Sequence, residues 1–171
     1  MNRCSWCNLK NQKYVDYHDN EWCVLNMDER YLYEMFILES FQAGLSWECV
    51  LNKREAFLKA YDNFDIDKVV KYDDVKIEEL RNNKNIIRNR LKIQASINNS
   101  KIYMNIVNEF GSFYNYLSHF SGGRIFYEIG KTTSALSDKI SFDLRCRGMK
   151  FVGSTIIYSY LCAVGIIYAH E

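Results

Sequence analysis

Residues 144–155 read Leu-Arg-Cys-Arg-Gly-Met-Lys-Phe-Val-Gly-Ser-Thr, with two glycines five residues apart. The pattern predicts a helix from about Ser134 to Arg147 that ends at Gly148, and a last helix from about Ser154 to Tyr168. Gly148 and Gly153 then frame a tight hydrophobic turn between two helices. A plain helix–helix corner is one interpretation. A phosphate site is the other, because free backbone N–H groups at a helix start bind anions such as a DNA phosphate.

Outward from this turn, the same signals predict helices along the whole chain. Apolar residues recur at steps of three and four behind capping residues. The expected helices run from Asp28 to about Gln42, from Ser46 to about Leu58, from Asp65, from Asp73, from Ile87 to Phe110 and from Ser112. No sustained two-residue alternation occurs, so we expect an all-α fold without a sheet. Segment 121–133 is the best candidate for a loop.

The composition is that of a globular protein. Hydrophobic residues make up 48% of the 171 residues and charged residues 25%, which argues against disorder, and the length suits one domain. No N-terminal segment has the apolar core of a signal peptide. The most apolar stretch, 151–169, is short for a membrane span and carries polar residues. We therefore expect a cytoplasmic protein without a membrane partner, whose six cysteines are thiols or metal ligands rather than disulfides.

Charge is segregated along the chain although the formal net charge is only +1. Residues 62–79 hold seven acids and three lysines, whereas residues 81–101 hold basic residues and no acid. The basic residues of this run are Arg81, Lys84, Arg88, Arg90, Lys92 and Lys101. A solvated helix face is one interpretation of the run, and a phosphate-facing surface is the other. Arg145, Arg147 and Lys150 add positive charge near Gly148.

Four residues at the two ends of the chain have the chemistry of metal ligands. Cys4, Cys7 and His18 lie near the N-terminus, and His170 is the penultimate residue. Thiolate and imidazole ligands suit zinc, which a structural site holds with four tetrahedral ligands. Such an ion would tie the two termini together. Buried thiols and surface histidines are the alternative interpretation of the same residues.

A second cluster combines aromatic residues with one carboxylate. Tyr14, Tyr17 and Trp22 surround the segment 18–21, and Trp47 follows a glycine-containing turn. Glu39 lies on a helix whose other residues are mostly apolar, where a carboxylate is either paired or functional. Aromatic walls with one buried carboxylate describe a pocket for a flat, electron-poor ring. Ordinary core aromatics with a salt-bridged glutamate are the alternative.

Four segments in register resemble the 3-methyladenine DNA glycosylase I family. They are Tyr-His-Asp-Asn-Glu-Trp at 17–22, Leu-Glu-Ser-Phe-Gln-Ala-Gly-Leu-Ser-Trp at 38–47, Asn-Ile-Ile-Arg-Asn-Arg-Leu-Lys-Ile-Gln-Ala at 85–95, and Arg-Gly-Met-Lys-Phe-Val-Gly-Ser-Thr at 147–155. The resemblance covers nearly the whole chain. It implies an all-α helix–hairpin–helix glycosylase fold with the N- and C-termini brought together. Residues 1–171 would form a single glycosylase domain, with two small helical lobes around a base pocket.

The resemblance also implies an activity and partners. The protein would hydrolyse the N-glycosidic bond of 3-methyladenine in double-stranded alkylated DNA, as a monomer. It would release free 3-methyladenine and leave an abasic site without cutting the strand. A structural zinc ion would join the termini.

Residue roles follow from the matched positions. Glu39 matches the glutamate that recognises the alkylated base. The other matched residues are the pocket aromatics Tyr14, Tyr17 and Trp47, the neighbouring tryptophans Trp6 and Trp22, the DNA-binding hairpin with Gly148, Lys150, Gly153 and Ser154, and the zinc ligands Cys4, His18 and His170.

The sequence departs from the family at the metal site and in one turn. The family's fourth zinc ligand is a cysteine a few residues beyond the last histidine, whereas this sequence ends at Glu171. Cys7 is our preferred fourth ligand, with a water molecule or a carboxylate of Glu171 as alternatives. Cys23 stands where the family usually has glycine.

Two other classes of protein compete with the glycosylase hypothesis. A non-catalytic protein of the same fold could bind alkylated bases in DNA, although loss of Glu39 or Trp47 would then be expected and both are present. A cysteine hydrolase could use Cys49 or Cys146, although the sequence places no histidine–acid pair beside either.

Overall fold

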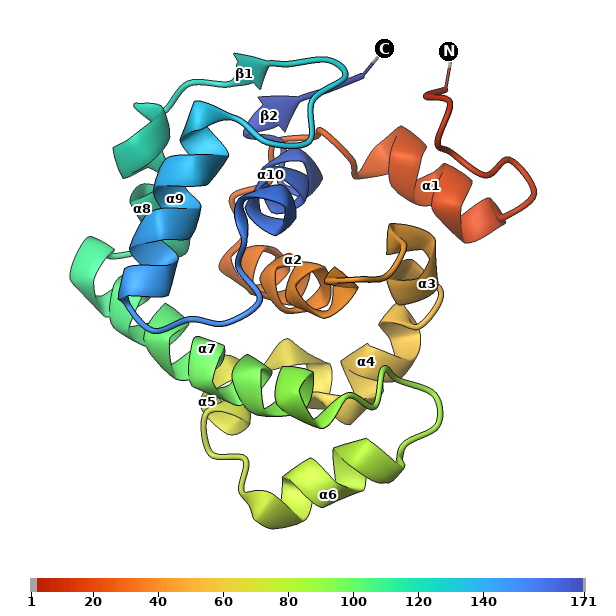
Figure 1. Ribbon diagram of the computed structural model, residues 1–171, viewed down its shortest axis with the longest axis vertical. Helices are drawn as coiled ribbons and strands as arrows, with labels where there is room; N and C mark the ends of the chain where they lie inside the picture. Colours follow the sequence, from red (N-terminus) through yellow and green to blue (C-terminus); the bar gives the residue numbers. More distant parts are fainter. Residues whose placement is uncertain (1–2, 171) are drawn as a thin grey trace.

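The computed structural model describes residues 3–170, and helices dominate it (Figure 1). The elements in chain order are α1 (Gln12–Asn20), α2 (Glu29–Gln42), α3 (Trp47–Leu51), α4 (Arg54–Ala60), the 3₁₀ helix η1 (Asp62–Phe64), α5 (Ile66–Val69), α6 (Asp74–Asn82), α7 (Arg90–Phe110), α8 (Phe113–Ser121), β1 (Phe126–Tyr127), α9 (Ala135–Cys146), α10 (Ser154–Ala163) and β2 (Ile167–Tyr168). The all-α fold class is confirmed, and the buried apolar side chains form one cluster.

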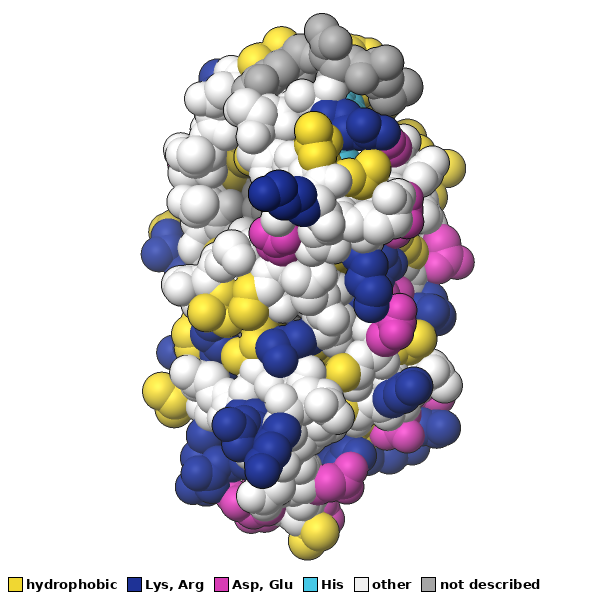
Figure 2. Space-filling model, turned by 90° about the vertical axis from the view of Figure 1, so that its right-hand side faces the viewer, with side chains coloured by type: hydrophobic (Ala, Val, Ile, Leu, Met, Phe, Trp, Pro, Cys, Tyr) yellow, Lys and Arg dark blue, Asp and Glu magenta, His cyan; other side chains and the backbone are white. Residues whose placement is uncertain are grey.

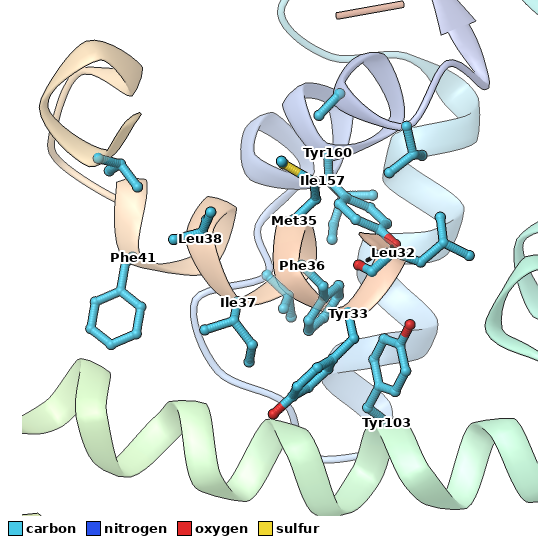
Figure 3. Close-up of a cluster of buried hydrophobic side chains, with 14 of the residues drawn as sticks. Leu32, Tyr33, Met35, Phe36, Ile37, Leu38, Phe41, Tyr103, Ile157 and Tyr160 are labelled. Carbon is cyan, nitrogen blue, oxygen red and sulfur yellow. Dashed lines mark hydrogen bonds between the residues drawn. The ribbon is translucent and has the colours of Figure 1, made fainter. Parts of the chain in front are cut away.

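Helix α2 is the centre of the molecule and packs against α3, α7, α8 and α10 (Figures 1 and 3). Asp28 caps its start by accepting a hydrogen bond from the Tyr31 N–H at 2.8 Å. Every residue in 32–41 is buried, so this helix has no solvated face over that span. Glu34 and Glu39 are therefore carboxyl groups inside a core, where each requires a partner.

The predicted helix starts are confirmed at Ser46, Asp65, Asp73, Ser112 and Ser134, whose side chains accept backbone hydrogen bonds. The bounds of three predicted helices are wrong, including those of the last helix. The segment expected as one helix from Ser46 to Leu58 is broken into α3 and α4. The long helix α7 starts at Arg90 rather than Ile87, because the Asn89 side chain caps it by accepting the Lys92 N–H.

The expectation of no sheet is wrong at one place. The last helix ends at Ala163 rather than near Tyr168, and the chain then forms β2, which pairs in parallel with β1. Gly165 makes this possible with φ +79°, since a Cβ there would lie 2.2 Å from the backbone nitrogen of Leu25. Strands of two residues are too short for alternation to reveal them in a sequence.

The predicted helical hairpin is confirmed. Gly148 ends the turn after α9 with φ +97°, and the Met149 N–H donates to the Leu144 carbonyl at 3.0 Å. Gly153 then precedes α10 as its N-cap residue, and no side chain caps that helix. Helices α9 and α10 pack against each other along the hairpin.

Charged side chains of both signs cover the face shown in Figure 2. In the basic run, Lys84, Arg88 and Arg90 are exposed, and none forms an ion pair with a described residue. Lys92 is different, because it is only 7% exposed. The interpretation of the run as one solvated or phosphate-facing surface is therefore wrong for Lys92. Over residues 3–170, no helix combines the length and apolar character needed to cross a membrane.

Candidate functional site

A pocket of about 310 Å³ lies where α1, α2, α3 and α10 meet. Its walls include Tyr14 and Tyr17 from α1, Trp47 from the start of α3, and Trp6 and Trp22. Glu39 enters it from α2, and Ser159 enters it from α10. The structure therefore brings together all six pocket residues that the sequence singled out, from segments up to 41 positions apart.

The Glu39 carboxyl group is buried and incompletely satisfied. Glu39 is 1% exposed, and its Oε2 atom has no hydrogen-bond partner among the described residues. Burial raises its pKa to about 8, and a hydrogen bond with Ser159 offsets part of that rise. The empty pocket therefore favours a protonated carboxyl group at neutral pH.

Glu34, one turn earlier on α2, shows the contrasting arrangement. Its two carboxylate oxygens accept hydrogen bonds from Arg54 Nε at 2.7 Å and Arg30 Nη1 at 3.1 Å. Glu34 is therefore a salt-bridged glutamate of this helix, whereas no described residue forms a salt bridge with Glu39, so the salt-bridge alternative is wrong for Glu39. A buried carboxyl group left without a charged partner is typical of a ligand site.

Aromatic rings pack against one another in tilted pairs around the pocket. The Tyr17 and Trp47 rings have centroids 5.3 Å apart, and those of Trp6 and Tyr14 are 5.2 Å apart. The indole Nε1 of Trp47 is buried and has no partner in the described part of the chain. The pocket thus offers a flat ligand aromatic faces, one carboxyl group and one unused N–H donor.

Cys4, His18 and His170 form a second cluster at the joined ends of the chain. One ligand-type atom from each lies within 4.8 Å of the others, and Cys4 Sγ is 3.9 Å from His170 Nδ1. Asp19 Oδ1 lies 2.9 Å from His18 Nδ1, and Arg3 holds the same carboxylate at 2.7 Å. A carboxylate behind a histidine ring is the usual support of a metal ligand, so these residues fit three positions of a zinc site.

Cys7 lies outside this cluster. Its thiol is 3.9 Å from the Tyr14 carbonyl oxygen, to which it donates, and burial raises the pKa of Cys7. A protonated thiol is a poor metal ligand. Glu171, the other protein alternative for the fourth position, lies outside the described residues.

The hairpin adjoins the pocket through the first turn of α10. Thr155 and Ile156, from the first turn of α10, line the pocket directly after Gly153. Lys150 is exposed, whereas the Ser154 hydroxyl donates to Asp138 Oδ1 at 2.5 Å. Ser154 therefore has its backbone N–H, and not its hydroxyl, available for a phosphate.

Sequence reasoning missed several pocket residues. Gln42, Lys131, Thr155, Ser159 and Cys162 also line the pocket. Three of them recur at helical spacing in α10, which is otherwise apolar, and that spacing was a usable signal. Neither Cys49 nor Cys146 lines the pocket, so the structure gives no support to a cysteine hydrolase there.

Comparison with known proteins identifies relatives along the whole chain. Residues 6–171 match the family model described as methyladenine glycosylase. The chain is 41% identical to DNA-3-methyladenine glycosylase 1 of Escherichia coli, over 99% of this chain and 94% of that protein.

Solved structures agree with this match. A crystal structure of 3-methyladenine DNA glycosylase I superposes with a TM-score of 0.94 at 37% identity, over 99% of this chain and 96% of that one. A tyrosine-to-phenylalanine variant of such an enzyme, in complex with 3-methyladenine, superposes with a TM-score of 0.93 at 31% identity, over 99% and 94%.

The buried Glu39 predicts an unusual dependence of stability on pH. Its folded-state pKa of about 8 lies above the unfolded value of about 4.3, so its stabilising contribution is full below about pH 4.3 and is lost as the pH rises toward 8. Glu39→Gln removes this loss. We expect the variant to exceed the wild type in unfolding free energy by about 3 kcal/mol at pH 7 and by little at pH 4.5.

Denaturant unfolding across this pH range measures the difference. Glu55→Gln is the matched control, because the Glu55 side chain is 77% exposed and should give no such trend. Parallel stability curves for Glu39→Gln and the wild type would contradict the burial argument.

Proposed function

Because the chain belongs to the methyladenine glycosylase family and is a DNA-3-methyladenine glycosylase, we propose that it holds the excised base in the pocket around Glu39. The observation that carries this assignment is the pair of unsatisfied polar atoms there, Glu39 Oε2 and Trp47 Nε1. Buried polar groups are normally paired, so two unpaired polar atoms on residues that line the same pocket support a polar ligand there. A purine that carries an exocyclic amine and ring nitrogens can supply both partners.

Charge explains how the lesion is distinguished from normal adenine. Adenine alkylated at N3 within DNA carries a delocalised positive charge, whereas normal adenine is neutral. The cation favours the ionised form of Glu39, and a charge-assisted hydrogen bond then joins the carboxylate to the exocyclic amine. The faces of Tyr17 and Trp47 add cation–π attraction of about 0.5–2 kcal/mol each. Neutral adenine gains neither the charge-assisted hydrogen bond nor the cation–π attraction.

The same charge limits what binding alone can do for the rate. As the glycosidic bond breaks, positive charge leaves the base for the sugar, so attraction to the cationic base favours the ground state. Acceleration must then come from geometry and the exclusion of water, acting on a base that is already a good leaving group. Lys131 lines the pocket, but its ammonium is paired with Glu128 at 3.4 Å and is not a free amine for a lyase.

DNA is proposed to dock on the hairpin at Gly148–Gly153. The first turn of α10 has no side-chain cap, and Lys150 is exposed beside it, so phosphate can bind there. Thr155 lies next to this surface and lines the pocket. A base extruded from the duplex, which costs a few kcal/mol of stacking and pairing, can enter the pocket from there. Action as a monomer and on double-stranded DNA stays a prediction of the resemblance, and a cytoplasmic location stays a prediction of the sequence.

Zinc is proposed at Cys4, His18 and His170. The three ligand-type atoms converge, and Asp19 orients the His18 ring, which supports a structural ion that ties the ends of the chain together. The ion would supply stability and no chemistry in the pocket. Cys7, our preferred fourth ligand from the sequence, now has weaker support than a water molecule, because its thiol binds the Tyr14 carbonyl.

The direct test of function is base release. Incubation with methylated duplex DNA should liberate 3-methyladenine, identified by chromatography, and leave abasic sites in unbroken strands. Glu39→Gln should weaken binding of 3-methyladenine by about tenfold at a pH where the free base is protonated, because the variant loses the carboxylate that pairs with the cation while keeping the shape. Binding without release would indicate the non-catalytic alternative, and strand breaks before alkaline treatment would exclude a simple hydrolase.

The hairpin assignment predicts a specific loss of DNA affinity. Gly153→Asp places a carboxylate beside the proposed phosphate site, so affinity for abasic duplex DNA should fall about tenfold or more and depend less steeply on salt. Asn108→Asp adds the same charge at an exposed position of α7 and should change little. Equal binding by folded Gly153→Asp, measured by fluorescence anisotropy, would show that DNA docks elsewhere.

The metal assignment predicts the zinc content of variants. Elemental analysis should find one zinc per chain in the wild type and in Cys7→Ser, and little in Cys4→Ser, which should also melt at a lower temperature. Loss of zinc from the Cys7→Ser variant would indicate that Cys7 is the fourth zinc ligand. If the wild-type protein is refolded with zinc and still contains no zinc, the proposed zinc site is wrong.

A further inference from the structure

Lys92 carries a buried ammonium group that contacts neither the base pocket nor the proposed phosphate site. It lies on α7, is 7% exposed and does not line the pocket. No carboxylate among the described residues forms an ion pair with it. Its ammonium instead donates to two backbone carbonyls, those of Phe41 at 2.8 Å and of Ala43. Both carbonyls belong to the C-terminal end of the central helix α2.

The end of α2 needs such a donor. The last carbonyls of a helix have no partner within the helix and carry partial negative charge. Ala43 leaves the helical conformation with ψ +116°, and the Leu45 N–H satisfies only the Gln42 carbonyl, at 2.6 Å. Lys92 therefore satisfies two further carbonyls, those of Phe41 and Ala43, from a different helix, 51 positions along the chain from Phe41.

The turn that Lys92 fixes carries part of the pocket. Gln42 lines the pocket at the end of α2, and four residues after Ala43 the chain places Trp47, the wall whose indole N–H is unpaired. Ser46, which caps α3, lies between them. A shift of the Ala43 carbonyl would move Trp47 relative to Glu39, which sits one turn back on α2.

The same face of α7 also holds the hairpin. Asn99, two turns after Lys92, donates to the Lys150 carbonyl at 2.8 Å and accepts the Lys150 N–H at 2.9 Å. The Phe151 ring lies 5.9 Å from the Lys92 ammonium. Helix α7 is thus the common support of the pocket turn and of the proposed phosphate-binding turn.

We propose that Lys92 is a positioning residue for base capture: it holds the end of α2, and with it Trp47, at a fixed place relative to the hairpin. A nucleotide whose phosphate docks on the hairpin then delivers its base to a pocket whose wall is already in place. The role in base capture rests on the proposed function. That Lys92 holds the end of α2 depends only on the contacts of Lys92 itself.

Three variants test the inference. Lys92→Met keeps the aliphatic stem and removes the ammonium. Val69→Ala, in the core of α5 and outside the pocket and hairpin, is the control for lost stability. Lys59→Met is the control for lost charge, at an exposed position of α4. If Lys92→Met fails to fold, Lys92→Leu, which also lacks the ammonium, takes its place on the same measurements.

Two measurements are made on each folded variant. Hydrogen exchange of the peptide covering 43–49 should be about tenfold faster in Lys92→Met than in Val69→Ala at equal distance below each melting temperature. Affinity for free 3-methyladenine by calorimetry should fall about tenfold in Lys92→Met and remain at the wild-type value in both controls.

Each result has a defined meaning. Exchange at 43–49 that matches Val69→Ala would overturn the inference, and so would a loss of base affinity no larger than in that control. A wild type that neither binds nor releases 3-methyladenine would refute the proposed function instead, and the exchange experiment would still decide whether Lys92 holds the turn.

Discussion

Burial of one unpaired carboxyl group is the constraint around which the molecule is organised. Residues 32–41 of helix α2 are all buried, and Glu34 is satisfied by two arginines, whereas Glu39 lines the pocket and keeps one oxygen without a partner among the described residues. Taking a carboxylate out of water is unfavourable, and the group responds by holding its proton, with a pKa of about 8. The empty enzyme is thus destabilised at the position where a cationic base would restore the balance, a common relation between stability and function.

The joined ends of the chain support one wall of that cavity. Helix α1 presents Tyr14 and Tyr17 to the pocket, and His18, the next residue, turns to the cluster with Cys4 and His170. The Trp22 ring lies between the two sites, 4.6 Å from the His170 ring and in the lining of the pocket. A metal ion at the cluster, which stays a proposal, would therefore stiffen the aromatic wall as well as the termini.

Local signals in the sequence were sufficient for most of the fold and for the pocket. Capping residues such as Asp28 and Ser46 act on neighbouring N–H groups, so they can be recognised without knowledge of distant contacts. The four quoted segments carry four of the six predicted pocket residues, namely Tyr17, Trp22, Glu39 and Trp47. Other features that the sequence did not predict depend on tertiary structure. The β1–β2 pair joins segments about 40 residues apart, and Lys92 was assigned to a charged surface although it packs against the end of α2. The role of Cys7 as a zinc ligand stays a prediction, with less support because its thiol donates to the Tyr14 carbonyl. Cys23 stands where the family usually has glycine, and its φ is +62°. The backbone therefore keeps the left-handed conformation that favours glycine although the residue has changed.

The central claim is that Glu39 is protonated in the empty pocket and ionised beside a base. Carbon-13 NMR of glutamate-labelled protein, with the Glu39 carboxyl signal identified by its absence from Glu39→Gln, measures this state directly. The account predicts that the signal of the free protein titrates with a pKa of about 8 and moves to the ionised position when N3-alkylated adenine cation saturates the pocket. A carboxyl group that titrates near its ordinary value of about 4.3 in the free protein would contradict the account.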